Sequence, residues 1–154
     1  VVNGQEVGSE KFAYKMHWLQ KVREYIAQDT PANKKYVVLG DFNIAPEDRD
    51  VHEPEAWHER ILCSTPERQA LGALLELGLV DTFRLFQQHD KSLSWWDYRA
   101  AGFRRNAGLR IDLVLTSNAM TERCQASYVD KEPRAWERPS DHAPVIAEFH
   151  FPGL

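Results

Sequence analysis

The sequence has 154 residues, of which 43% are hydrophobic and 27% are charged, and its formal net charge is −4. This size and composition are ordinary for one globular domain with a hydrophobic core. The negative charge excludes a general attraction to polyanions, so a nucleic-acid partner would need a local basic surface. Two cysteines without metal-type spacing exclude a cysteine zinc site and a disulfide framework, and no apolar run reaches the length of a membrane span.

The N-terminal third predicts a helix followed by a buried strand. The chain opens at Val1–Gly4, which is typical of a strand running into a turn, and we expect the N-terminal part of a larger domain to be missing. Residues 11–27 carry apolar side chains at helical spacing and predict an amphipathic helix. Residues 36–39 are apolar or β-branched and predict a strand buried on both faces. Asp41 and Asn43 follow that strand, where open α/β sheets usually bind ligands.

The middle of the chain predicts a long loop and a second helix. Residues 44–63 have no regular period, contain two prolines, and predict a loop with one helical turn near Pro54. Thr65 is a suitable N-cap and Pro66 suits the first helical position, so a helix is expected to start there. Its buried stripe is formed by leucines, and Gly78 suits its C-terminal end.

The C-terminal half predicts a series of strands. The expected strands are an aromatic one at 95–98, a buried one at 109–115, and two more at 124–129 and 145–149, with a polar loop at 99–108. No repeat or linker interrupts the chain, so the sequence predicts one compact unit of mixed α and β structure.

Three polar clusters lie beside the predicted strand ends. They are Asp41 with Asn43, Asp112 in an apolar strand, and Asp141-His142 before the last strand. A hard cation such as Mg²⁺ takes one or two carboxylates, another carboxylate can activate water, and an imidazole can donate to a phosphate oxygen. This set of side chains fits metal-assisted phosphodiester hydrolysis.

Structural explanations also exist for these residues. Asp41 and Asn43 are common turn residues, Asp112 could be a hydrogen-bonded core acid, and Trp95 could be ordinary core packing. A serine hydrolase is weakly supported, because Ser140 and His142 are not accompanied by a nucleophile-elbow motif.

Five segments resemble the exonuclease III family of apurinic/apyrimidinic endonucleases, within the endonuclease/exonuclease/phosphatase superfamily. They occur in the order expected of that family and cover nearly the whole chain. They are Gly40-Asp41-Phe42-Asn43-Ile44-Ala45-Pro46, Leu79-Val80-Asp81-Thr82-Phe83-Arg84, Ser94-Trp95-Trp96-Asp97-Tyr98-Arg99, Gly108-Leu109-Arg110-Ile111-Asp112 and Ser140-Asp141-His142-Ala143-Pro144-Val145.

The resemblance implies a role for individual residues. Asp41 would activate water and help bind metal, Asn43 would steady the phosphate, Asp112 would orient the phosphate-binding His142, and Asp141 would bind the metal. It also implies an apolar wall that receives a flipped-out abasic sugar, since a sugar without its base fits a small apolar pocket. Polar residues of the arginine-rich loop would contact the DNA backbone. The wall residues are Trp95, Leu109 and Ile111, and the backbone contacts are assigned to Arg99, Asn106 and Arg110.

The resemblance also implies a fold and an activity. The fold expected for residues 1–154 is the C-terminal part of a DNase-like four-layer α/β/β/α sandwich, forming a single domain that lacks its N-terminal part. The N-terminal metal-binding Glu, a further Asn and a catalytic-site Tyr of the family are not present in this sequence, so we expect the isolated chain to be weakly active or inactive and to expose apolar surface.

The expected function is a Mg²⁺- or Mn²⁺-dependent DNA repair phosphodiesterase with 3′–5′ exonuclease and abasic-site endonuclease activity. Its expected partner is double-stranded DNA with abasic sites or 3′ ends, in the bacterial cytoplasm, with a monomeric full-length protein and no membrane. The alternatives are another superfamily phosphodiesterase, such as a general DNase or a lipid phosphodiesterase, and a non-catalytic DNA-binding remnant.

Overall fold

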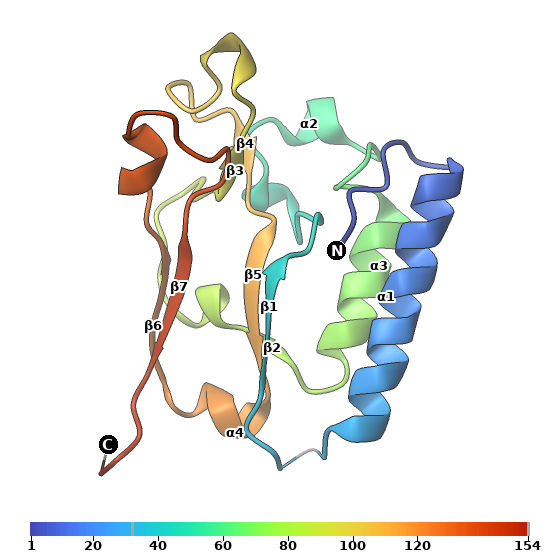
Figure 1. Cartoon of the computed structure of the whole chain (residues 1–154), viewed down its shortest axis with the longest axis vertical. Helices are drawn as coiled ribbons and strands as arrows, with labels where there is room; N and C mark the ends of the chain where they lie inside the picture. Colours follow the sequence, from blue (N-terminus) through green and yellow to red (C-terminus); the bar gives the residue numbers. More distant parts are fainter. Residues whose placement is uncertain (32, 154) are drawn as a thin grey trace.

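The structure is a computed structural model that describes residues 1–31 and 33–153. The chain contains both helices and strands (Figure 1). In chain order they are α1 (Glu10–Asp29), β1 (Val37–Asp41), α2 (Pro54–Trp57), α3 (Thr65–Leu75), β2 (Val80–Asp81), β3 (Trp95–Trp96), β4 (Gly108–Leu109), β5 (Asp112–Thr116), α4 (Asn118–Thr121), β6 (Cys124–Val129) and β7 (Val145–Phe149).

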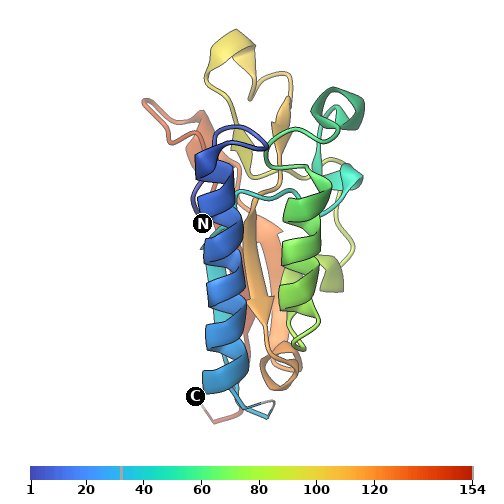
Figure 2. The ribbon, with the colours of Figure 1, turned by 90° about the vertical axis from the view of Figure 1, so that its right-hand side faces the viewer.

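Three layers build the molecule. The central sheet has the antiparallel order β1-β5-β2, and the β6-β7 hairpin lies on one side of it. Helices α1 and α3 lie side by side on the opposite side (Figures 1 and 2). Leucines and isoleucines of both helices meet Leu113 and Leu115 of β5 in the main core. This arrangement of helices on two stacked sheets confirms the mixed α and β, DNase-like fold class.

The first helix and strand agree with the sequence pattern, except for the burial of the strand. Helix α1 contains the predicted residues 11–27 and is capped by Ser9, whose hydroxyl accepts a hydrogen bond from the Phe12 N–H at 3.1 Å. Strand β1 is not buried on both faces as predicted, because Leu39 is 67% exposed. β1 is paired only on one edge within the described part of the chain. Large exposed apolar side chains such as Leu39 agree with the expected exposure of apolar surface.

Helix α3 begins at Thr65, one residue earlier than predicted. Ser64, not Thr65, is the N-cap, and it forms a capping box with Glu67. The hydroxyl of Ser64 and the carboxylate of Glu67 each accept a backbone N–H at the helix start, which explains why both polar residues are buried there.

The predicted strand at 109–115 is divided in two. Leu109 belongs to β4, which pairs with β3, whereas Asp112 is the first residue of β5, which pairs with β1. Asp112 therefore lies at a strand end and not inside a strand. The strands predicted at 124–129 and 145–149 are confirmed as β6 and β7. Among the described residues, no helix is both long enough and apolar enough to cross a membrane.

Candidate active site

Two carboxylates meet where β1 ends and β5 begins. Asp41 is the last residue of β1 and Asp112 is the first of β5, and the antiparallel register pairs them directly. Because the two strands are antiparallel, the carboxyl end of β1 lies beside the amino end of β5. The prediction that these polar residues gather at a strand end is thus correct, but the sheet is antiparallel.

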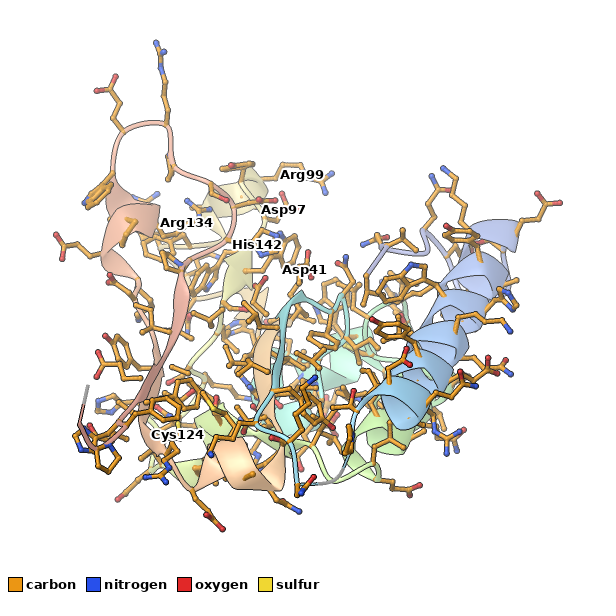
Figure 3. The ribbon with its side chains drawn as sticks, turned by 60° about the horizontal axis from the view of Figure 1, so that its bottom comes forward. Asp41, Asp97, Arg99, Cys124, Arg134 and His142 are labelled. Atoms are coloured by element: carbon orange, nitrogen blue, oxygen red, sulfur yellow. The ribbon has the colours of Figure 1, made fainter. Side chains whose placement is uncertain are left out.

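The third polar residue comes from the segment before β7. His142 forms an isolated β-bridge with Trp95, which places the 139–142 segment beside β3. The Nδ1 atom of His142 lies 2.8 Å from Oδ2 of Asp112. Its Nε2 atom lies 3.7 Å from Oδ2 of Asp41 and 3.9 Å from Oδ1 of Asp141. Figure 3 shows the side chains of His142 and Asp41 at the same end of the molecule.

A buried serine fixes the Asp112 carboxylate. The hydroxyl of Ser94 donates to Oδ2 of Asp112 at 2.7 Å and accepts the backbone N–H groups of Ile111 and Asp112 at 3.0 and 3.2 Å. These bonds offset the cost of burying the carboxylate and aim it at His142. Ser94 is a site residue that sequence reasoning did not single out, although it precedes the aromatic pair Trp95-Trp96.

Asn43 has a left-handed backbone beside Asp41. Its φ is 49°, its backbone N–H donates to Oδ1 of Asp41 at 2.8 Å, and its side-chain amide donates to the carbonyl of Val1 at 2.7 Å. Asn adopts this conformation more readily than most residues. The turn expected from the residue types is present, and the same turn brings the amide to the site.

The environment shifts two pKa values in the same direction. The hydrogen bond to Asp112 is the main cause that raises the pKa of His142, and the charges of Asp41 and Asp141 add to it against burial. Burial raises the pKa of Asp41, an effect opposed by the hydrogen bond from the Asn43 N–H and strengthened by the Asp112 charge. Both shifts follow from one imidazole and several carboxylates lying together at a partly buried place.

A cleft of about 550 Å³ opens in front of these residues. Both apolar and polar side chains line the cleft, as is usual for ligand-binding sites. Trp57 and Ile61, from α2 and the following loop, were not predicted and supply part of the apolar wall. The lining includes Asn3, Asn43, Trp57, Ile61, Leu62, Trp95, Asp97, Arg99, Ala107, Ile111, Asp141 and His142.

Two predicted wall residues line the cleft and the third does not. Trp95 and Ile111 are part of the lining, and the indole N–H of Trp95 donates to Oδ2 of Asp141 at 3.0 Å. This hydrogen bond holds the Asp141 carboxylate in place. The sequence predicted Asp141 as a site residue but not its bond to Trp95. Leu109 is only 1% exposed and packs in a small core with Val51 and Leu62, behind the wall. Trp96 is fully buried and belongs to the core.

The structure contradicts the predicted DNA contact of Arg110, and it shows the half-buried Asn106 hydrogen-bonded within the protein. Arg110 is 1% exposed, and its guanidinium donates to Asp50 at 2.7 Å and to Asp81 at 2.7 and 3.2 Å. Asn106 uses its side-chain oxygen for the indole of Trp96 and its amide for the carbonyl of Lys91. Both residues hold the fold together, because their polar groups are already bound to protein.

The remaining arginines of the loop agree with a DNA contact. Arg99 is at the rim of the cleft with its side chain 88% exposed, and Arg104 and Arg105 are also exposed. Arg99 pairs with Asp97 at 2.6 Å, and its hydrogen bonds lower the pKa of Asp97 to about 2. The loop from 97 to 107 extends from the end of the molecule that carries the site (Figure 1, yellow).

The donor set fits a divalent cation. Asp41, Asp112 and His142 each offer a ligand atom, and these atoms lie within 4.8 Å of one another. Asp112 is already engaged by Ser94 and His142, whereas the carboxylates of Asp41 and Asp141 lie 3.7 and 3.9 Å from Nε2 of His142. Oxygen donors of this kind suit Mg²⁺ or Mn²⁺ better than a soft metal.

Comparison with known proteins agrees with this geometry. Exodeoxyribonuclease III of Haemophilus influenzae is 37% identical over 146 residues, which are 90% of this chain and 55% of that protein. The 3′ phosphatase NExo from Neisseria, solved with a product DNA hairpin, has a TM-score of 0.92 and 47% identity, over 97% of this chain and 58% of that one. An AP endonuclease from Archaeoglobus fulgidus has a TM-score of 0.91 and 36% identity, over 97% and 58%.

The chain spans about half the length of the curated relatives it matches. The model of the Endonuclease/Exonuclease/phosphatase family matches residues 3–142, which include the whole polar cluster from Asp41 to His142. These relatives are of the exonuclease III and AP endonuclease type, as the motifs implied. The chain therefore belongs to the endonuclease/exonuclease/phosphatase family.

Proposed function

We propose that this chain carries the acid–base half of a metal-dependent DNA repair phosphodiesterase of the exonuclease III type. Its substrate would be duplex DNA, cleaved on the 5′ side of an abasic site and at 3′ ends. The observation that carries the proposal is the His142 imidazole, held at Nδ1 by Asp112 while Nε2 faces Asp41 and Asp141 at the mouth of the cleft.

Each residue has a step that its position allows. The scissile phosphate would lie against Nε2 of His142, which donates a hydrogen bond to a phosphate oxygen, while Asp112 keeps the proton on Nδ1. Asp41 would accept a proton from the attacking water. The amide of Asn43 would exchange its bond to Val1 for a bond to the phosphate.

The cation would be held by Asp141 and Asp41 and would be Mg²⁺ or Mn²⁺. A bound divalent cation neutralises charge on the phosphate and on the leaving oxygen. The Trp95 indole would keep the Asp141 carboxylate turned toward the cleft. Trp95 and Ile111 would meet the sugar, and the exposed arginines Arg99, Arg104 and Arg105 would contact the DNA backbone. A monomer in the bacterial cytoplasm remains our proposal for the full-length protein.

Removal of a 3′ phosphate is a second candidate reaction. It is favoured by the 47% identity to the Neisseria 3′ phosphatase, which was solved with a product DNA hairpin. The same cluster would serve, because a 3′-phosphate monoester and a phosphodiester present similar oxygens to His142 and the cation.

Cleavage of labelled duplexes tests the proposal. Three substrates would be compared, with one abasic analogue, a recessed 3′ hydroxyl end or a 3′ phosphate end, each with Mg²⁺ and with chelator. The proteins would be the chain, Asp41→Ala, and the charge-matched control Asp90→Ala at an exposed turn. Since the chain spans about half of its relatives, we expect slow cleavage, measured under single-turnover conditions.

The outcomes separate the alternatives. We expect Mg²⁺-dependent cleavage that Asp41→Ala abolishes and Asp90→Ala retains. Cleavage that survives chelator or Asp41→Ala would contradict the assigned chemistry. DNA binding without any cleavage would favour the non-catalytic DNA-binding alternative.

A further inference from the structure

One lysine of α1 is turned into the protein. Lys15 is fully buried, and its ammonium forms an ion pair with the equally buried carboxylate of Glu67 on α3. Its other hydrogen bonds go to the carbonyl oxygens of Asn43 at 2.6 Å and Asn3 at 3.1 Å. An ammonium has three donors, so every donor of Lys15 has a partner.

Glu67 carries the connection to a second segment. One of its oxygens accepts the Leu62 N–H at 3.0 Å, and the other accepts the N–H and the hydroxyl of Ser64 at 3.1 and 2.6 Å. The Lys15–Glu67 pair therefore joins the start of the chain, the turn after β1 and the loop before α3. Three of the residues tied in this way, Asn3, Asn43 and Leu62, line the cleft.

Two of the tied residues have unfavourable backbones. The φ angles of Asn43 and Leu62 are 49° and 75°. A left-handed conformation is costly for a residue such as Leu62 and less so for Asn43, and it persists where surrounding contacts impose it. The carbonyl of Asn43 is held by Lys15 and the N–H of Leu62 by Glu67, so the ion pair contacts both strained residues directly.

Stability alone does not account for a charged pair at this place. Two charges are costly to bury, and an apolar pair of similar volume is often as stable or more stable. Burial lowers the pKa of Lys15, although the Glu67 carboxylate opposes this shift, so burying the pair carries a cost. What an apolar pair would not supply is a hydrogen bond to each strained segment.

We propose that Lys15 and Glu67 are positioning residues, which hold Asn43 and the Leu62 wall of the cleft in the geometry that phosphodiester cleavage requires. This inference rests on the proposed function and deepens it. Neither residue reaches the substrate. They act through the Asn43 turn, whose N–H binds Asp41 and whose amide would bind the phosphate.

Paired variants test the positioning role. Lys15→Met leaves a buried carboxylate unpaired, whereas the double variant Lys15→Met/Glu67→Met replaces the pair by two apolar side chains. The double variant thus removes the hydrogen bonds without leaving a charge. Lys21→Met, on the exposed side of the same helix where Lys21 pairs with Glu24, is the matched control.

Two measurements are made on each protein. Amide hydrogen exchange followed by NMR reports on Asn43 and Leu62, with Leu113 and Leu115 of the β5 core as the internal reference. Steady-state cleavage of the abasic-analogue duplex gives kcat and KM separately. In the double variant we expect about tenfold faster exchange at Asn43 and Leu62, with the core reference unchanged. We also expect kcat to fall about ten- to a hundredfold, with KM changed less than about twofold.

A double variant that keeps both the exchange rates and the kcat of the wild type would overturn the proposal. The same conclusion would follow if core exchange and exchange at Asn43 and Leu62 rose together, since that is general destabilisation. If Lys15→Met does not fold, the double variant decides. If the wild-type chain cleaves no substrate, the proposed function fails, while the exchange rates still support or refute the positioning of Asn43 and Leu62.

Discussion

Two charged clusters lie on either side of residues 110–112, and they differ in how their charges are satisfied. Asp112 points into the candidate active site, whereas Arg110, two residues earlier, points into an ion network with Asp50 and Asp81. In the ion network, Arg84 and Arg110 balance the two aspartates, and the Arg110 guanidinium lies 4.5 Å from the centroid of Phe83. The ion network is charge-balanced and closed.

The active site has the opposite balance. Three carboxylates face one imidazole, and the cleft in front of them is open. The excess negative charge favours a cation. The hydrogen bond with Asp112, together with the charges of the neighbouring carboxylates, raises the pKa of His142. In the ion network, burial lowers the pKa of Arg110, but the charges of Asp81 and Asp50 more than offset this and raise it. A cluster of acidic residues therefore does not by itself indicate an active site. The cluster that lines the cleft differs from the ion network in having more carboxylates than cationic side chains.

Replacing Arg110 should break the ion network and have the largest effect on stability. Arg110→Met leaves Asp50 and Asp81 buried without their shared partner, and we expect the free energy of unfolding to fall by about 3–5 kcal/mol. Urea denaturation measures it. The exposed Arg105→Met is the control and should change stability little. An Arg110→Met protein of normal stability that has lost DNA binding would restore the direct DNA contact predicted from the sequence.

Replacing Asp112 should disable the active site with a smaller loss of stability. Asp112→Asn removes the negative charge that favours the protonated imidazole and replaces one acceptor oxygen by an NH2 donor, and we expect cleavage to slow about a hundredfold. NMR titration of the imidazole should give a pKa above 6.5 in the wild type and a lower one in the variant. Asp81→Asn, in the ion network, should leave the His142 titration unchanged.

The effect of Asp112→Asn on the free energy of unfolding should depend on pH. The pKa of His142 is higher in the folded than in the unfolded protein, so its contribution to stability is complete below about pH 6.5 and is lost as the pH rises through the folded pKa. The difference in unfolding free energy between wild type and Asp112→Asn should thus be larger at pH 6 than at pH 9. An equal difference at both pH values would contradict the raised pKa.

The two neighbouring tryptophans give a closer test of the distinction between site and core. Trp95→Phe removes the indole N–H that binds Asp141, and Trp96→Phe removes the one that binds Asn106. We expect Trp95→Phe to raise the Mg²⁺ concentration for half-maximal cleavage about tenfold. Trp96→Phe should lower the melting temperature but leave that concentration unchanged. The reverse pattern would place the metal away from Asp141.

The smallest effect on stability is expected for Arg99, at the rim of the cleft. Arg99→Ala should raise the pKa of Asp97 from about 2 toward its ordinary value of 3.8, as followed by carboxyl-carbon NMR. Because the pair is exposed, the free energy of unfolding should hardly change. If Arg99 contacts a DNA phosphate, the slope of the logarithm of the DNA-binding constant against the logarithm of salt concentration should become smaller by about one. Arg104→Ala is the control, since it changes the same charge without removing the partner of Asp97.

The sequence by itself determined the main elements and the residue types of the site. Apolar periodicity identified α1, β6 and β7, and the motif around Asp41 and Asn43 and the one at Asp141-His142 indicated the chemistry. These features are local, because helix periodicity and turn preferences depend on neighbours in the chain. The family resemblance rested on the same short motifs.

The tertiary structure decided which polar residues act and which only support the fold. The residue type does not distinguish Arg110 from Arg99. Arg110 is buried in ion pairs with Asp50 and Asp81, whereas Arg99 is exposed at the cleft. Ser94 and Lys15 gained their roles from partners 18 and 52 positions away, Asp112 and Glu67. Burial and long-range pairing depend on how distant segments pack, and spacing along the chain does not encode them.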